Sequence, residues 1–370
     1  MPSQIRSFAT PALLALALPA LAALVAGCAT MPAPPAMSVA PERKPLVIAH
    51  RGASALRPEH TLEAYRKAIE DGADTIEPDL VSTRDGVLVA RHENEISGTT
   101  DVAARPEFAS RRTAKTIDGE RVEGWFTEDF TLAELKTLRA RERLPQLRST
   151  AWDGQFPIPT LTEIIDLVAA ESTRRGRVIG FAPELKHPTH FATLDLAMEP
   201  PLLETLRAHP YTRSAPVLIQ SFETANLRAL RARIDRGGNL RLLQLLGAPG
   251  EHPYDTVAAG APRTYAAMTN AAGLAEIARY ADAIGPAWRD LDIADGRSRL
   301  VDQAHAAGLQ VVTYTYRPEN HFLGDYAGPG GPAARHEAGS VRQIRAHAAL
   351  GIDAFFTDDP AVGRRAVDGD

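Results

Sequence analysis

The sequence of 370 residues has one cysteine, Cys28, few aromatic residues and no strong excess of charge of either sign. A single cysteine cannot form a disulfide bond within the chain. The formal net charge of -5 argues against a general nucleic-acid-binding protein, because such proteins are normally basic. Aromatic residues make up only 6% of the chain, and they are not interleaved with basic residues as in a stacking platform for bases. These absences leave a globular protein that is long enough to bury a sizeable core.

The apolar run at residues 12–26 is shorter than the roughly 20 residues that a transmembrane helix needs. It follows Arg6 and ends in small residues before Cys28. A basic start, a short apolar segment and small residues at the end predict a secretory signal peptide over residues 1–27. An uncleaved membrane anchor is the alternative, and the length of the run disfavours it.

The last residues of the predicted signal, Val25-Ala26-Gly27-Cys28, resemble a bacterial lipoprotein box. In such a box the cysteine is lipidated and becomes the first residue of the mature protein, so Cys28 is the expected membrane anchor. Residues 28–45 are rich in alanine, proline and methionine and are expected to form a flexible tether. Ala29 rather than aspartate after the cysteine favours the periplasmic side of the outer membrane of a bacterial envelope.

From residue 46 onward, short apolar runs alternate with amphipathic stretches. Repeated β-α units of this kind predict a parallel sheet, and at this length a closed (β/α)8 TIM-type barrel over residues 46–366. The predicted strands are residues 46–50, 75–80, 87–92, 178–185, 216–222, 240–246, 281–285, 309–316 and 354–357. The predicted helices are residues 61–71, 161–170, 195–208, 224–234, 271–280, 297–307 and 341–350.

Nine predicted strands are one too many for such a barrel. The connection Arg84-Asp85-Gly86 is so short that it can join only antiparallel strands. We therefore expect residues 87–92 to be the second arm of a hairpin that rises above the barrel rim. This hairpin would bring His92 to the carboxyl end of the barrel strands, where barrel enzymes have their active sites.

Two segments interrupt the alternation of strands and helices. Residues 94–159 are charged and contain one helix-like piece, residues 132–139. We expect an insertion beside the mouth of the active site that shapes or covers the substrate pocket, since a structureless loop of this length would be unusual. Residues 317–338 are expected to form a long loop at the same face.

Three acidic residues lie at the carboxyl ends of predicted strands. Glu77 and Asp79 are two residues apart and so share one face of their strand, and Glu184 ends another strand. Carboxylates that converge repel one another unless a cation neutralises them, and oxygen ligands suit calcium or magnesium. A purely salt-bridged cluster, with Arg51 or Lys186 as the partner, is the alternative.

Two histidines and two cations end strands at the same predicted rim. His50 and His92 are candidates for acid and base catalysis, because an imidazole exchanges a proton near neutral pH. Arg51 and Lys186 would stabilise negative charge on the oxygens of a phosphate group. The set predicts a metal-assisted acid–base site for an anionic substrate.

The motifs that carry this chemistry resemble one known family. The segments HRGA and PEHT, the pair Glu77 and Asp79, the strand that ends in His92, and the later segments PELK, IQSF and FFTDDP are similar to the glycerophosphodiester phosphodiesterase family. The resemblance covers nearly all of the chain after about residue 45 and is greatest to the secreted bacterial branch, which has a long insertion after the second histidine. It implies hydrolysis of deacylated phospholipids to sn-glycerol 3-phosphate and an alcohol.

The same resemblance assigns roles to the site residues. Glu77, Asp79 and Glu184 would bind one divalent cation, usually calcium in this branch, with magnesium as the alternative. One of His50 and His92 would deprotonate the attacking group, and the other would protonate the leaving alkoxide. The attacking group would be either water or the 2-hydroxyl of the substrate. A phospholipase-like enzyme, a glycerol-phosphate-polymer phosphodiesterase and a non-catalytic binding lipoprotein remain alternatives.

Five further residues are candidate substrate contacts. Glu59 would orient Arg51 or touch the substrate, and the other four lie near the ends of later strands as expected walls of a glycerol pocket, with barrel packing as the alternative for the aromatic ones. Those four are Gln220, Phe222, Tyr314 and Tyr316. The chain departs from the family at Glu93, where aspartate is usual, and at residues 313–316, which read Thr-Tyr-Thr-Tyr instead of a tryptophan-like motif.

Overall fold

The computed structural model describes residues 44–369. The predicted signal peptide, Cys28 and all but the last two residues of the predicted tether lie outside the described residues. Within residues 44–369, no helix is both long and apolar enough to cross a bilayer.

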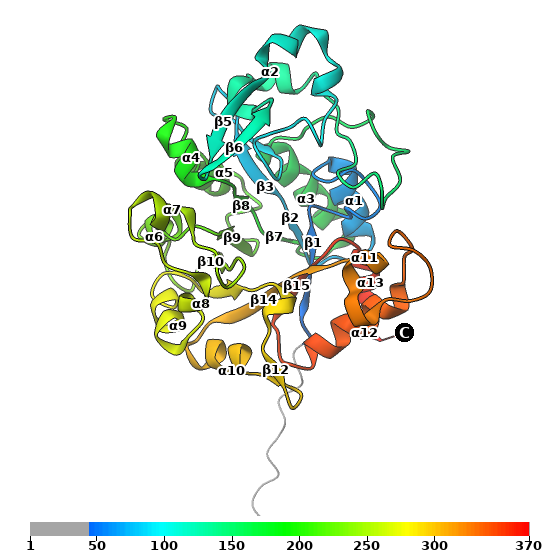
Figure 1. The fold of residues 1–370 in the computed structure, drawn as a ribbon, viewed down its shortest axis with the longest axis vertical. Coiled ribbons are helices and arrows are strands. Elements are labelled where there is room, and N and C mark those ends of the chain that lie inside the picture. The colour runs from blue at the N-terminus through cyan, green and yellow to red at the C-terminus, as the bar shows by residue number, and fades with distance from the viewer. Residues whose placement is uncertain (1–43, 370) are drawn as a thin grey trace, which may run out of the picture. The chain divides into compact units, whose positions relative to one another are not determined.

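Eight parallel strands close into a barrel, which confirms the predicted fold class (Figure 1). Each strand pairs with the next around the ring, and the last pairs with the first. In ring order the strands are β1 (Leu46–His50), β2 (Thr75–Glu77), β7 (Gly180–Phe181), β9 (Val217–Ser221), β10 (Leu240–Leu245), β11 (Ala283–Gly285), β14 (Gln310–Tyr316) and β15 (Ala354–Thr357).

Helices surround this ring and cover its outer face. Those that match predicted helices are α1 (Leu62–Glu70), α3 (Leu161–Arg175), α5 (Glu199–Ala208), α6 (Ala225–Arg231), α9 (Ala271–Ile277), α10 (Arg299–Ala306) and α12 (Glu337–Ala348). The sequence did not predict α4 (Pro188–Thr193), α7 (Tyr254–Ala258), α8 (Tyr265–Met268), α11 (Asn320–Leu323) or α13 (Pro360–Asp368). Thr61 caps α1 by accepting a hydrogen bond from the backbone N–H of Ala64, as its residue type predicts.

Successive residues of a barrel strand pack alternately into an outer and an inner apolar cluster. On β1, Val47 and Ala49 pack outward with the helices, whereas Ile48 packs inside the barrel with Val312 and Phe356. His50 shares the inner face with Ile48 and therefore points toward the barrel axis at the carboxyl end of its strand.

Prolines break two of the predicted strands. Pro78 separates β2 from β3 (Asp79–Ser82), and Pro183 separates β7 from β8 (Glu184–Leu185). Proline has no N–H to donate to a sheet, but its carbonyl still accepts: Pro78 O accepts from Glu184 N at 2.9 Å. β3 and β8 then pair above the barrel with Asp79 opposite Glu184, which brings two predicted metal ligands together.

The predicted hairpin is confirmed. β3 pairs antiparallel with β4 (Leu88–Ala90), and Leu80 lies opposite Ala90. Gly86 makes the turn with a φ of 77°, a conformation that glycine adopts without strain.

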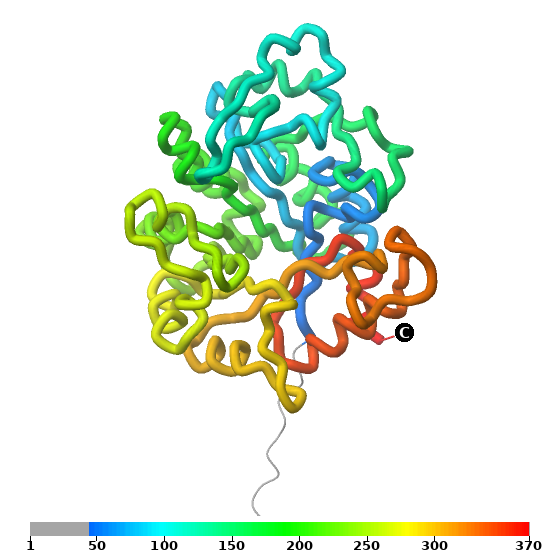
Figure 2. Tube along the Cα trace, viewed as in Figure 1, coloured from blue at the N-terminus to red at the C-terminus, as the bar shows by residue number. Residues whose placement is uncertain are grey.

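The insertion is more structured than the sequence predicted. It contains a hairpin of β5 (Thr113–Ile117) and β6 (Glu120–Gly124), the short helix α2 (Leu132–Leu135) and three 3-10 helices, which are η1 (Val102–Ala104), η2 (Pro106–Arg111) and η3 (Thr127–Asp129). The chain trace shows it as one continuous block beside β3 (Figure 2).

Three small elements complete the fold. A short hairpin of β12 (Ile293–Ala294) and β13 (Arg297–Ser298) follows the 3-10 helix η4 (Trp288–Asp290). The expected loop at residues 317–338 contains α11 and the 3-10 helix η5 (Gly324–Tyr326).

Candidate active site

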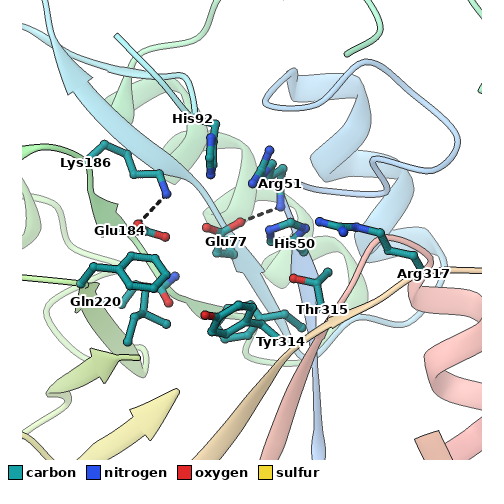
Figure 3. A pocket seen from close by; sticks show the side chains of 13 residues that line it. His50, Arg51, Glu77, His92, Glu184, Lys186, Gln220, Tyr314, Thr315 and Arg317 are labelled. Carbon is teal, nitrogen blue, oxygen red and sulfur yellow. Dashed lines mark hydrogen bonds and ion pairs between the residues drawn. The ribbon is translucent and has the colours of Figure 1, made fainter. Parts of the chain in front are cut away.

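A cavity of about 130 Å³ opens at the carboxyl ends of the barrel strands (Figure 3). Nine of the residues predicted for the site line it: His50, Arg51, Glu77, His92, Glu184, Lys186, Gln220, Phe222 and Tyr314. Four residues that the sequence did not indicate line it as well: Leu245, Thr315, Arg317 and Phe356. The structure therefore brings together residues from both ends and the middle of the chain.

Three buried carboxylates form a compact cluster at this cavity. Glu77, Asp79 and Glu184 each offer one oxygen within 4.8 Å of the others. Burial, opposed by Lys186 and reinforced by the Asp79 carboxylate, raises the pKa of Glu184 to about 8. Burial and the charges of Asp79 and Glu184 likewise raise the pKa of Glu77. Full ionisation of all three carboxylates would therefore place more negative charge in the cluster than its surroundings stabilise.

Both interpretations of the carboxylates find support in their contacts. Lys186 Nζ donates to Glu184 Oε1 at 2.6 Å, and Arg51 Nε lies 3.3 Å from Asp79 Oδ2. Two cations face three carboxylates, and the buried Asp79 Oδ1 accepts no hydrogen bond among the described residues, although Lys186 Nζ lies 3.6 Å from it. An all-oxygen cluster with more carboxylates than cations fits a hard divalent cation such as calcium or magnesium.

His60 also belongs to this cluster, although it was not among the predicted site residues. Its Nε2 lies 2.8 Å from Asp79 Oδ2, and its Nδ1 lies 2.8 Å from the Tyr65 hydroxyl. His60 is fully buried and has a φ of 56°. Its position within PEHT was the only available signal. We conclude that it orients the Asp79 carboxylate.

Each candidate catalytic histidine is held at Nδ1 by a carboxylate. His50 Nδ1 lies 2.6 Å from Asp358 Oδ1, and His92 Nδ1 contacts Glu93 Oε1. Although burial opposes it, Arg148 and Arg317 hold the pKa of Asp358 well below its usual range, so this carboxylate is ionised and accepts the proton of Nδ1–H. The Nε2 atom is then the basic nitrogen of the His50 ring.

Both histidines are neutral at neutral pH in this environment. Burial and the positive charge of Arg51 lower the pKa of His50 to about 4. Burial, Arg51 and Lys186 lower the pKa of His92 to about 3. An anionic substrate beside Arg51 and Lys186 would offset part of their charge and thereby raise both values.

Two of the candidate substrate contacts do not line the cavity. The carboxylate of Glu59 accepts from Arg51 Nη1 at 3.1 Å and so orients that cation, which is one of the two roles predicted for it. Tyr316 is fully buried outside the barrel, where its hydroxyl lies 2.8 Å from His347 Nδ1. The pairing of β14 with β15 has an irregularity between Thr313 and Tyr316, so Tyr314 and Tyr316 no longer share a face.

A wider groove of about 780 Å³ adjoins the cavity and shares His92, Glu184, Lys186 and Phe222 with it. Its outer wall includes Asp118 and Glu120, from the turn of the β5–β6 hairpin, and Tyr254 and Val257, from α7. The insertion therefore shapes the space next to the site, as the sequence predicted.

The fold and the site together define a barrel enzyme with a carboxylate cluster and paired histidines at the ends of its strands. The model of the glycerophosphoryl diester phosphodiesterase family matches residues 50–362. The chain belongs to this family and is an enzyme of phosphodiester hydrolysis, as its motifs predicted.

Proteins with related sequences support this assignment. A glycerophosphodiester phosphodiesterase of Arabidopsis thaliana is 37% identical over 331 residues, which cover 82% of this chain and 85% of the relative. The glycerophosphodiester phosphodiesterase of Haemophilus influenzae is 30% identical over 292 residues, which cover 74% of this chain and 77% of the relative.

A solved structure supports the fold. The phosphodiesterase of Oleispira antarctica, in complex with the product sn-glycerol-3-phosphate, superposes with a TM-score of 0.58 at 21% identity. The match covers 88% of this chain and 98% of that protein.

Proposed function

We propose that this protein hydrolyses glycerophosphodiesters, the deacylated forms of phospholipids, to sn-glycerol 3-phosphate and an alcohol. The observation that carries the proposal is the joint lining of one small cavity by His50, His92, Arg51 and two members of the carboxylate cluster. A binding protein would need the cations to hold a phosphate. It would not need a proton donor and a proton acceptor, so the histidine pair favours an enzyme.

Glu77, Asp79 and Glu184 would hold one divalent cation, for which we propose calcium. When bound, such an ion supplies positive charge that stabilises the phosphorus-bound oxygens as negative charge develops on them. Magnesium demands a stricter octahedral geometry and usually keeps several waters, whereas calcium accepts irregular sets of carboxylates.

The protein's own residues would carry the proton transfers. Arg51 and Lys186 bind the non-bridging oxygens of the phosphate. Nε2 of one histidine takes the proton of the attacking hydroxyl, which belongs to water or to the substrate's 2-hydroxyl, as that oxygen bonds to phosphorus. The bond from phosphorus to the departing oxygen breaks, and the other histidine donates a proton to that oxygen. When the 2-hydroxyl attacks, the product of this step is a cyclic phosphate, and water then opens the ring in a second step that gives sn-glycerol 3-phosphate.

The walls of the site favour small diesters over intact lipids. The cavity is only about 130 Å³, and charged or amide side chains form much of its lining. Among the described residues, the large apolar side chains that are exposed are Leu46, Val178, Leu194, Val257 and Ile293, of which Val257 alone lines the adjoining groove. An enzyme that takes intact lipid needs a continuous apolar rim, and this set does not form one.

We also propose that the protein is exported and anchored at Cys28 by lipid, with residues 28–45 as its tether. Several acyl chains on one residue anchor a protein stably where a single chain does not. Replacement of Cys28 by serine should release the protein from washed membranes into the soluble fraction. Continued membrane attachment of that variant would overturn this proposal.

The decisive experiment measures release of sn-glycerol 3-phosphate from glycerophosphocholine by the protein without residues 1–27. We expect activity that is lost on chelation and restored by calcium more than by magnesium. Stronger restoration by magnesium would replace calcium in the proposal. A folded protein that releases nothing from choline, ethanolamine or glycerol diesters would overturn the proposed function.

A further inference from the structure

The carboxylates that hold the two histidines are themselves held by two arginines of one short segment of the insertion. Arg148 Nη2 donates to Asp358 Oδ2 at 2.6 Å. Arg143 Nη2 donates to Glu93 Oε2 at 2.7 Å, and its Nη1 donates to Glu93 Oε1 at 3.0 Å. Two arginines within six residues of the insertion, 143–148, therefore connect to both halves of the proposed acid–base pair.

Each arginine also binds a second, buried carboxylate. Arg148 Nε donates to Glu319 Oε1 at 2.8 Å, and Arg143 Nε donates to Glu59 Oε2 at 2.8 Å. Glu59 in turn accepts from Arg51, the phosphate-binding cation of the proposed mechanism. Each guanidinium is thus fixed on two sides, and its planar array of donors determines where the histidine's carboxylate can lie.

The barrel alone holds these carboxylates incompletely. Arg317, at the end of β14, donates to Asp358 from its Nε at 2.9 Å, but Glu93 has no basic partner from the barrel among the described residues. Without Arg143, Glu93 would keep only its contact with His92. The insertion therefore supplies the arginine that binds Glu93, and it supplies the second of the two arginines that bind Asp358.

We propose that Arg143 and Arg148 are positioning residues, through which the insertion aligns both catalytic histidines. This inference rests on the proposed roles of His50 and His92. The competing explanation is that the two arginines only dock the insertion on the barrel. The two explanations differ in what a substitution changes: alignment affects kcat, whereas docking affects stability.

The test compares Arg148→Met and Arg143→Met with Arg141→Met as the matched control. Arg141 lies two residues before Arg143, and its one ion-pair partner within residues 44–369 is Asp153, at 3.5 Å, with half of the Arg141 side chain exposed. For Arg148→Met we expect kcat to fall roughly 10- to 100-fold, as for loss of a hydrogen bond between charged groups, with KM changed by less than about threefold. For Arg143→Met we expect a fall of about tenfold, because Glu93 is partly exposed and water replaces the lost donor.

Double-mutant cycles separate alignment from docking. If Arg148 acts through Asp358, Arg148→Met should have little further effect on kcat in the Asp358→Asn variant and its full effect in the Glu93→Gln variant. Independent, multiplicative losses of kcat in both backgrounds would overturn the proposal. So would Met variants that lose thermal stability but keep the kcat of the unaltered protein.

Two further measurements keep the outcome interpretable. Arg148→Lys preserves the charge but not the planar array of donors, so it should restore folding if Arg148→Met unfolds and should recover only part of kcat. Full kcat in the lysine variant would contradict the proposal. His50→Ala and His92→Ala are measured in the same assay, because retained activity there would refute the two-histidine function itself and not merely this inference.

Discussion

The two proposed catalytic histidines stand in contrasting surroundings. His50 ends a barrel strand, and its partner Asp358 is almost fully buried between Arg148 and Arg317. His92 follows a hairpin above the rim, faces the open groove, and has a partner, Glu93, that is 36% exposed. The protein thus has two pairs of an imidazole and a carboxylate, one buried at the end of a barrel strand and one partly exposed above the barrel rim. The difference indicates that the His50 side depends on exact packing, whereas the His92 side tolerates water.

Removal of either imidazole should have the largest effect. Because the proposed mechanism gives each histidine a different proton to transfer, we expect His50→Ala and His92→Ala each to lower kcat by about 10³-fold, within the range for loss of general acid–base catalysis. Steady-state release of sn-glycerol 3-phosphate measures this. His305→Ala is the control, since that ring is exposed and paired with Asp353 away from the cavity. Near-normal turnover by either variant would show that its histidine does not transfer a proton in the reaction.

Substitution of Asp358 and of Glu93 should show whether burial makes the two histidine–carboxylate pairs differ in their effect on kcat. The amide of Asp358→Asn can donate a hydrogen bond to His50 Nδ1, which favours the tautomer with the proton on Nε2. That tautomer has no basic nitrogen toward the substrate. Because the site is buried, water cannot replace the lost carboxylate. We expect Asp358→Asn to lower kcat on the order of 10²-fold. We expect Glu93→Gln to lower kcat by about tenfold, because solvent reaches the pair of His92 and Glu93. Equal losses in the two variants, measured in the same assay, would show that burial does not distinguish the two sides.

A further effect concerns stability rather than turnover, and it arises at Glu142, the residue before Arg143. Burial raises the pKa of Glu142 to about 7, against a hydrogen bond that its carboxylate accepts from the Leu144 N–H at 2.9 Å. An acid with a raised pKa in the folded state binds more protons folded than unfolded between about pH 4.5 and 7, so stability falls as pH rises through that window. Glu142→Gln should remove this dependence and stabilise the protein by up to about 3 kcal/mol at pH 8.

Thermal unfolding between pH 5 and 8 measures this effect. Glu107→Gln is the control, because that side chain is exposed in the same insertion. A stability profile of Glu142→Gln parallel to that of the unaltered protein would contradict the prediction.

The sequence predicted the features that repeat along the chain. Alternating strands gave the barrel and the inward direction of His50, and the short turn at Gly86 gave the hairpin, because local geometry alone decides both. Glu77, Asp79 and Glu184 were found because they lie next to strand ends. The break at Pro78 was not predicted, because residues 75–80 were expected to form one strand, although a proline lacks the N–H that a central strand donates.

Contacts between irregular segments could not be predicted in this way. Arg143 and Arg148 meet Glu59 and Asp358 across long stretches of chain, and no periodicity marks either end of such a contact. The position of Tyr316 near a strand end predicted a pocket wall, with barrel packing as the alternative, and the local irregularity in strand pairing that separates it from Tyr314 has no signature in the residues themselves.

The hydrogen bond between His50 and Asp358 has a consequence for biosynthesis. It joins residues that are 308 positions apart, and β1 itself pairs with β15. A chain that is still being synthesised therefore contains the clustered carboxylates and both histidines long before it can orient His50. Turnover should therefore begin only after β15 has paired with β1 and closed the barrel, even if the first strands fold earlier.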